Sequence, residues 1–265
     1  MSKLSDLIRR ASHAEPARLG FGAGTHTRTA SMLLAASIGE RWERGVGEAV
    51  AAGADVLLLG GRPSEKELPE AVSAADGRPC GRIADVEADQ LPQLRDAGID
   101  FLILDPQAPA SVLQDEELGF VLRLASDLSE AQLRTLGTLS LDALYVEGKD
   151  DGPPTIERQL ELQRISGLAR GPLFVQVRAG AEQQELLSLR DAGVIILSID
   201  LKERGGGALR SVRGVIDALP RRRKRRDEEP AVTLLHSVGR PEPEAEEDED
   251  EDEEEERLLP DPHRP

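Results

Sequence analysis

The sequence predicts an α/β fold, a (β/α)8 barrel whose two halves resemble each other. Three observations predict it. Short apolar runs alternate with helical patterns, the runs are apolar on both faces, and one helix-then-strand unit recurs along the chain. Such alternation favours parallel strands joined by right-handed crossovers, and compact barrels of this kind need only about 200 residues. An open doubly wound sheet is the alternative fold.

The recurring unit reads LRDAGIDFLILD at residues 94–105 and LRDAGVIILSID at residues 189–200. Gly98 and Gly193 stand where a glycine commonly ends a helix. Looser copies of the unit occupy residues 48–61 and 133–148. The matches predict two half-barrels, strands one to four and strands five to eight. The alternative is that LRDAG is a favourable helix end used twice.

The eight strands are expected to begin near residues 18, 55, 81, 100, 120, 142, 173 and 194. The clearest helical patterns cover residues 88–97, 129–137, 156–168, 181–191 and 207–219. Ser129 and Gln132 have the spacing of a capping box, which supports a helix start there. An apolar helix at 29–38 and a second helix at 41–52 are expected in the long connection after the first strand.

The chain is expected to have three parts. Residues 1–16 form an N-terminal helix or cap, residues 17–220 form the barrel, and residues 221–265 form a basic, then acidic, tail. The run at 241–257 is almost entirely Glu and Asp, and such a run buries too little apolar surface to order, so the tail is expected to be disordered. It could contact a basic protein partner. The alternative is a solubilising tail with no specific partner.

Charge and composition narrow the function classes. Residues 221–265 contain 9 Lys and Arg against 17 Asp and Glu, a net charge of −8, so the −17 of the whole chain leaves −9 for residues 1–220. Direct nucleic-acid binding is not expected from an acidic barrel. Cys80 is the one cysteine, which excludes an internal disulfide. Without a membrane-length apolar run or a signal-peptide core, the sequence predicts a soluble, cytoplasmic protein with no membrane contact.

Active sites of such barrels lie at the C-terminal ends of the strands. Asp105 and Asp200 occupy equivalent places there in the two halves, and Glu147 ends a related unit. These carboxylates could share protons or hold a divalent metal; alternatively, each caps a helix or pairs with an arginine at the rim. His26 follows the expected first strand and could act as an acid or base. These four residues are the catalytic candidates, and no metal site is assigned.

The expected loop after the last strand predicts an anion site. Gly205, Gly206 and Gly207 would expose backbone N–H groups at a helix N-terminus. Cationic side chains expected beside them are those of Arg178, Lys202 and Arg204. Further substrate contacts are expected from Gly24, Arg28 and Arg62. The alternative is that the three glycines form a flexible surface loop.

The stretch AAGADVLLLGGRP, residues 51–63, resembles the second-strand region of pterin-binding barrels such as dihydropteroate synthase. The resemblance covers one helix–strand unit and implies a barrel of the TIM type. The asparagine-rich first-strand motif of that family has no counterpart, because GFGAGTHTRT stands in its place. No site residue is therefore carried over from the family.

Two functions remain open. The first is an enzyme with lyase- or isomerase-like chemistry on an anionic small molecule, which could be phosphorylated, a choice based on fold analogy. Its cofactor is unknown, and an aromatic content of 2% offers few rings to stack on a flavin or nicotinamide. The second is a non-catalytic barrel that serves as a binding or scaffolding module, with the charged tail as its interaction segment.

Overall fold

The computed structural model describes residues 2–12, 31–39, 42–61, 67–83, 86–125, 127–148 and 152–220. Within these ranges, the side chains of residues 43 and 202–204 are not described. The chain divides into two compact units, Met1–Arg223 and Lys224–Pro265. The second unit, and with it the expected disordered tail, lies outside the described residues.

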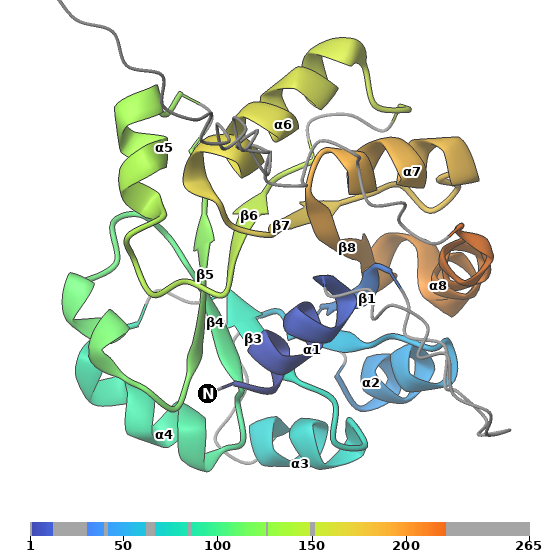
Figure 1. Cartoon of the computed structure of the whole chain (residues 1–265). Helices are drawn as coiled ribbons and strands as arrows, with labels where there is room; N and C mark the ends of the chain where they lie inside the picture. Colours follow the sequence, from blue (N-terminus) through green and yellow to red (C-terminus); the bar gives the residue numbers. More distant parts are fainter. Residues whose placement is uncertain are drawn as a thin grey trace, which may run out of the picture. The chain divides into compact units, whose positions relative to one another are not determined.

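Eight parallel strands close into a barrel in the order of the sequence (Figure 1). The strands are β1 Leu33–Ile38, β2 Val56–Leu59, β3 Cys80–Ile83, β4 Phe101–Leu104, β5 Gly119–Arg123, β6 Ala143–Val146, β7 Leu173–Gln176 and β8 Val194–Asp200. β1 pairs with both β2 and β8, which closes the ring. The predicted barrel is confirmed, and the open sheet is excluded.

Helices surround the strands (Figure 1). They are α1 Lys3–Ser12, α2 Trp42–Ala51, α3 Glu67–Ala74, α4 Leu91–Asp96, α5 Glu130–Leu136, α6 Ile156–Ala169, α7 Gln183–Asp191 and α8 Leu201–Ala218, with the 3₁₀ helices η1 Ala88–Gln90 and η2 Ala110–Gln114. The expected capping box forms at α5, where the Ser129 hydroxyl accepts from the Gln132 N–H. Between β4 and β5 the chain forms only η2, so the equivalent connections after β4 and β8 differ.

The position of the first strand is the main difference from the prediction. β1 lies at Leu33–Ile38, within the stretch expected to be an apolar helix, and not near residue 18. The sequence LLAASI is rich in alanine and leucine, which favour helices, but burial on both faces of the strand overrides that preference. Residues 18–21 lie outside the described residues and precede β1. Helix α3, which follows β2, was not expected.

The core has two layers. Apolar side chains on the outer faces of the strands pack against the helices, and a second cluster fills the barrel interior. The interior cluster includes Ala35, Leu58, Ile103, Tyr145 and Phe174. The barrel is therefore a packed core, as is usual for this fold, and any site must lie at one of its ends.

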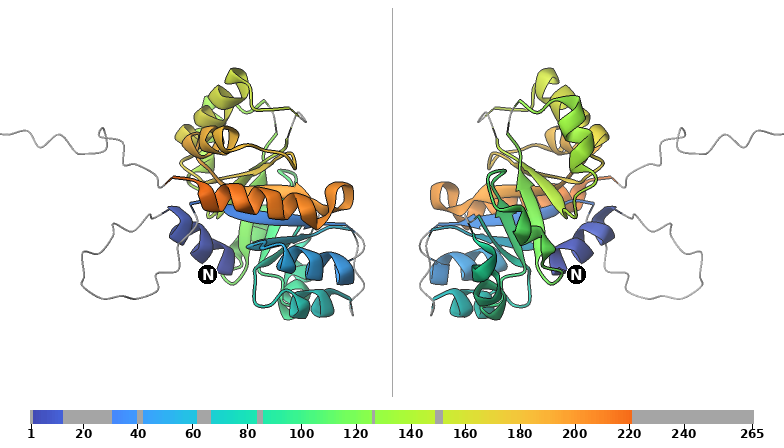
Figure 2. Two further views of the ribbon diagram at one scale, coloured as in Figure 1. Left: turned by 90° about the vertical axis from the view of Figure 1, so that its right-hand side faces the viewer. Right: turned by 90° about the vertical axis from the view of Figure 1, so that its left-hand side faces the viewer.

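Helix α1 closes the N-terminal end of the barrel (Figure 1). Leu4 and Ile8 belong to the interior cluster. Both oxygens of the Asp100 carboxylate accept backbone N–H groups at the start of α1, from Lys3 at 2.8 Å and Leu4 at 2.9 Å. The Ser2 hydroxyl donates to Asp142 Oδ2 at 2.7 Å. Figure 2 shows α1 at one end of the strands, which leaves the C-terminal end for a site.

The repeated units fall four strands apart. LRDAGIDFLILD contains the end of α4 and all of β4, and LRDAGVIILSID contains the end of α7 and all of β8. The looser copies end in β2 and β6. Gly98 and Gly193 have φ values of +86° and +95°, as expected for glycines that end helices. These positions match two half-barrels of four strands each.

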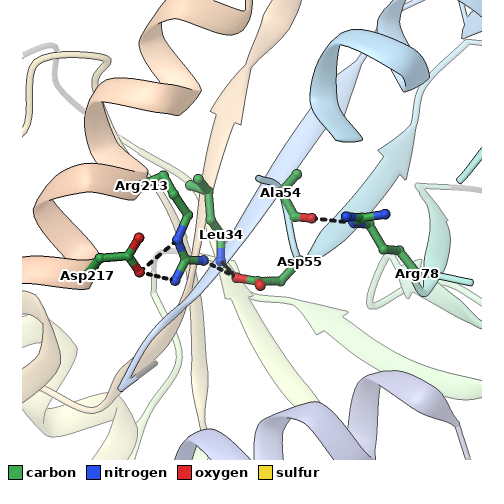
Figure 3. A network of polar contacts seen from close by, with 6 residues as sticks. All are labelled: Leu34, Ala54, Asp55, Arg78, Arg213 and Asp217. Atoms are coloured by element: carbon green, nitrogen blue, oxygen red, sulfur yellow. Dashed lines mark hydrogen bonds and ion pairs between the residues drawn. The ribbon is translucent and has the colours of Figure 1, made fainter. Parts of the chain in front are cut away.

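A polar network ties α8 to the first two strands (Figure 3). Asp55, directly before β2, accepts from the Leu34 N–H at 2.8 Å and from Arg213 Nη1 at 2.7 Å. Arg213 also donates to Asp217 on its own helix, and Arg78 donates to the Ala54 carbonyl. The network therefore links the last helix to the first pair of strands. None of the described helices has the length and hydrophobicity needed to cross a membrane.

Candidate functional site

Charged and polar side chains gather where the strands end at the C-terminal face. Asp105, Arg123 and Glu147 each stand two residues beyond a member of the interior cluster on the same strand, namely Ile103, Val121 and Tyr145. Because side chains alternate along a strand, these three residues occupy inward-facing positions. Asp200 ends β8, two residues beyond the buried Ser198. We call the set Asp105, Arg123, Tyr145, Glu147, Ser198 and Asp200 the mouth cluster.

The mouth cluster contains an ion pair. Arg123, the last residue of β5, donates to Glu147 Oε1, just beyond β6. This hydrogen bond is the main reason that the pKa of Arg123 is raised, and the charges of Tyr145 and Asp105 act in the same direction. One catalytic candidate therefore pairs with an arginine that the sequence had not singled out, and a second lies near enough to feel its charge.

Tyr145 is a buried aromatic member of the mouth cluster. Its side chain is 6% exposed, and its ring packs edge-on against Phe174 with centroids 5.3 Å apart. Burial raises the pKa of Tyr145, and a hydrogen bond with Ser198 opposes that rise. Glu147, Arg123 and Asp200 are the charges that act on the phenol. A phenol that keeps its proton therefore faces the charged rim.

The remaining carboxylates do not converge on one point. Asp105 accepts the Gln107 N–H at 3.0 Å, which is the hydrogen bond of a local turn. Within the described ranges, no group of three or more His, Cys, Asp or Glu side chains could hold a metal ion. The metal option for Asp105, Glu147 and Asp200 thus has no geometric support, whereas proton transfer by single carboxylates does not require convergence.

The expected anion loop has a different form from the one predicted. α8 starts directly after β8, and Gly205, with φ 64° and ψ 174°, separates its first turn from the rest. The Gly206 N–H donates to Glu48 Oε1 of α2 at 2.6 Å. A carboxylate of the protein itself therefore occupies the position that an anion would take at this amide. Gly207 follows within the helix.

A small cavity of about 60 Å³ lies beside the mouth cluster, between the loops that follow β6 and β7. It is lined by Gly148, Gly152, Pro153, Pro154, Thr155, Arg158, Val175, Gln176, Val177, Arg178, Ala181, Glu185 and Leu189. Arg178 pairs with Glu185. Arg158 donates to Glu161 at 2.8 Å and to the Glu147 carbonyl at 2.6 Å. Arg178, one of the cations expected to bind substrate, lines this cavity.

Several expected site residues lie outside the description. They are Gly24, His26, Arg28 and Arg62, together with the side chains of Lys202 and Arg204. The first three belong to the segment between α1 and β1. They therefore precede the first strand and do not follow it, so the reason for placing them at the C-terminal face no longer holds.

Sequence reasoning missed Arg123, Tyr145 and Ser198. The candidates from the sequence are residues at or just after the expected strand ends, whereas these three lie within the strands. A signal was present, because Arg123 and Tyr145 are polar residues in otherwise apolar runs. Counting alternate positions back from each strand end would have found them.

No protein-family model matches the sequence, and no curated protein matches it. Solved structures do resemble it. A tryptophan synthase α-subunit from Pyrococcus furiosus has a TM-score of 0.58 at 12% identity over 72% of this chain and 98% of its own. KGPDC from Streptococcus mutans has a TM-score of 0.55 at 12% identity, over 71% of this chain and 98% of its own. Thiamine phosphate pyrophosphorylase from Pyrococcus furiosus has a TM-score of 0.53 at 14% identity, over 71% of this chain and 96% of its own. At such identities the likeness shows the fold alone: the chain is a TIM barrel, with no specific family identified.

Proposed function

We propose that this barrel is an enzyme that moves protons on a small anionic substrate at its C-terminal face. One observation carries the proposal, the Arg123–Glu147 ion pair, both of whose charges act on the buried Tyr145 phenol. A cation, a carboxylate and a protonated phenol within one site are the parts that general acid–base catalysis requires. Lyase- or isomerase-like chemistry fits this set.

Each group has a defined task in this proposal. Arg123 stabilises negative charge that develops on the substrate. Glu147 accepts a proton, and the Tyr145 phenol, which burial keeps in its protonated form, is the hydrogen-bond and proton donor. Asp105 and Asp200 adjust the pKa values of these groups, since the charge of Asp105 raises the pKa of Arg123 and the charge of Asp200 raises that of Tyr145.

The anionic end of the substrate is proposed to bind in the cavity beside β7. Arg158 and Arg178 line it, and the N-terminus of α6 opens onto it at Thr155. Helix N-termini and guanidinium groups both favour phosphate. One structurally similar protein is named for a phosphate ester, thiamine phosphate, which supports a phosphorylated substrate. The Gly206 amide of the expected glycine loop is already bonded to Glu48.

A specific observation favours a second function, a non-catalytic binding module. Arg123, Arg158 and Arg178 each pair with a carboxylate of the protein. An anionic ligand therefore competes with Glu147, Glu161 and Glu185 for these guanidinium groups, each of which has further N–H donors. If no anion binds them, the C-terminal face is an internally neutralised surface and the barrel is a scaffold.

Thermal-shift measurements with phosphate, pyrophosphate, glycerol 3-phosphate and ribose 5-phosphate test the anion site. At least one probe is expected to raise the Tm of the full chain, and Arg178→Gln is expected to abolish that rise. Arg134→Gln is the matched control, because Arg134 is exposed on α5 and pairs with Glu130 on the same helix. No rise with any probe, or an equal loss in both variants, contradicts the anion site.

Proton transfer has a separate test. Glycerol 3-phosphate and ribose 5-phosphate, the two probes with carbon-bound hydrogens, are incubated with the protein in D₂O, and deuterium uptake at their carbon atoms is followed by NMR. Tyr145→Phe and Glu147→Gln are expected to slow the uptake while the thermal shift persists. A bound probe that never exchanges, or exchange that survives both substitutions, would favour the binding module.

A further inference from the structure

Helix α6 exposes apolar side chains to solvent on the outside of the barrel. Ile156 is 83% exposed and Leu160 is 61% exposed, more than any other large hydrophobic residue in the described part of the chain. The helix lies at the periphery in Figure 1 and Figure 2. The inner face of the helix already packs against the barrel, since Leu162, Ile165 and Ala169 are buried there. The outer residues therefore have a separate reason to be apolar.

The exposed residues share one face of the helix. At 100° per residue, Ile156, Leu160 and Gly167 fall within about 40° of one another. Gly167 would meet nothing within 4 Å if it carried a Cβ, so it leaves a shallow gap on this face. We call Ile156, Leu160 and Gly167 the α6 stripe. It joins two protruding side chains to one small residue, a pattern that fits a second helix.

Two opposite charges flank the α6 stripe on the same side. By the same rotation Glu157 and Arg164 lie within about 20° of each other, and they are two helical turns apart. Both residues are exposed. Arg164 gives one N–H to the Leu128 carbonyl at 2.9 Å, and a guanidinium has further donors. The stripe thus has an acidic end and a basic end along one edge.

We propose that the occupant of the α6 stripe is the α6 stripe of a second copy, packed antiparallel about a two-fold axis. Such an axis brings the same edge of both helices together with opposite direction. Glu157 of each copy then faces Arg164 of the other, the two Leu160 side chains meet beside the axis, and each Ile156 lies over Gly167 of the other copy. A parallel two-fold arrangement would instead set this charged edge against the opposite edge of the partner helix, so only the antiparallel arrangement pairs Glu157 with Arg164. An interface of this kind is isologous and closes at two copies.

The size of the contact predicts its strength. A helix of 14 residues is about 21 Å long. A contact made by this helix alone therefore buries less area than the roughly 800 Å² per partner of a standard interface. The dimer is therefore expected to be concentration-dependent, with dissociation in the micromolar range.

Sedimentation velocity on the full chain, from low to high micromolar concentration, tests the charge pattern. Glu157→Arg and Arg164→Glu are each expected to weaken the dimer at least tenfold, and the double variant is expected to recover most of the loss. Circular dichroism checks that each variant folds. A chain that stays monomeric at all concentrations overturns the proposal, as does a double variant no better than the single ones.

Cysteine cross-linking tests the axis itself. Leu160→Cys is expected to form an intermolecular disulfide rapidly under mild oxidation, since the two side chains meet there. Cys80 is buried and does not compete. Glu70→Cys is the matched control, because Glu70 is exposed on α3, away from α6. Equal cross-linking rates for the two variants would show that the α6 stripe is not the interface.

Discussion

At the scale of single residues, the aspartates of the repeated units serve two ends of the barrel. Asp55, Asp100 and Asp142 each stand directly before a strand and accept hydrogen bonds at the N-terminal end. Asp105 and Asp200 stand at strand ends on the opposite face. The first set holds helices and strands together, and the second borders the mouth cluster. Position along the strand therefore decides the role of a carboxylate.

Asp142 gives a pH-dependent prediction. Burial raises its pKa, the charge of Asp100 adds to the rise, and the hydrogen bond from Ser2 opposes it. The folded state thus binds this proton more tightly than the unfolded state does. The stabilisation by Asp142 is complete below its ordinary pKa and is lost as pH rises through the folded value. Asp142→Asn, which stays neutral and keeps an acceptor, is expected to be at least as stable as the natural protein near pH 7.

Urea unfolding between about pH 4 and pH 7 measures this effect. The advantage of Asp142→Asn is expected to shrink as the pH falls toward the ordinary Asp range. Asp96→Asn, at an exposed position on α4, is the control and is expected to show no such trend. A variant that is less stable than the natural protein near pH 7 would mean that the ionised carboxylate is favoured at this position.

At the scale of elements, glycines set the turns between helices and strands. Gly53, Gly98 and Gly193 have positive φ values of 83°, 86° and 95°. They end α2, α4 and α7 and redirect the chain into β2, β4 and β8. In the fourth related unit Gly137 has φ −64°, so this looser copy reaches its strand by a different turn.

Gly98→Ala and Gly193→Ala are expected to destabilise the fold. An added Cβ would lie 2.8 Å from Val72 Cγ1 at position 98, and 2.0 Å from Ser166 Oγ at position 193. Together with the positive φ, this predicts a cost of about 1–3 kcal/mol for each substitution. The control is Gly214→Ala within α8, where nothing lies within 4 Å, and a gain of up to about 1 kcal/mol is expected. Urea denaturation gives all three values, and equal effects would contradict this account.

At the scale of the whole molecule, the barrel interior is filled by matched large and small residues. The Phe101 ring lies where a Cβ on Gly81 would stand, 2.2 Å from its Cζ. These residues are paired neighbours on β3 and β4. Gly81 therefore makes room for Phe101, which with Phe174 is one of the two largest fully buried side chains of the interior.

Gly81→Ala is expected to cost about 1–3 kcal/mol, because one methyl group overfills a packed interior. Its backbone has no positive φ, so the loss would report packing alone. Chemical unfolding measures it, with Gly47→Ala on the open face of α2 as the comparison. A neutral result at position 81 would show that the Phe101 ring can move aside without loss.

Seven of the eight strands could be predicted to within a residue or so. β2 to β8 are apolar runs bounded by glycines and charged residues, as in strands buried on both faces. β1 could not be predicted, because LLAASI carries no local signal that separates a buried strand from a buried helix. The same limit hid Arg123 and Tyr145, whose meaning depends on which face of the strand looks inward.

By itself, the sequence determined the barrel, its repeated units and the positions of Asp105, Glu147 and Asp200 at strand ends. These features follow from local periodicity and from the order of elements, which a linear pattern contains. Only the tertiary structure decided that Arg123 pairs with Glu147, that Glu48 occupies the Gly206 amide, and that α1 closes the far end. Each of these contacts joins segments distant in the chain, and closure of the ring is what brings them within hydrogen-bonding or packing distance.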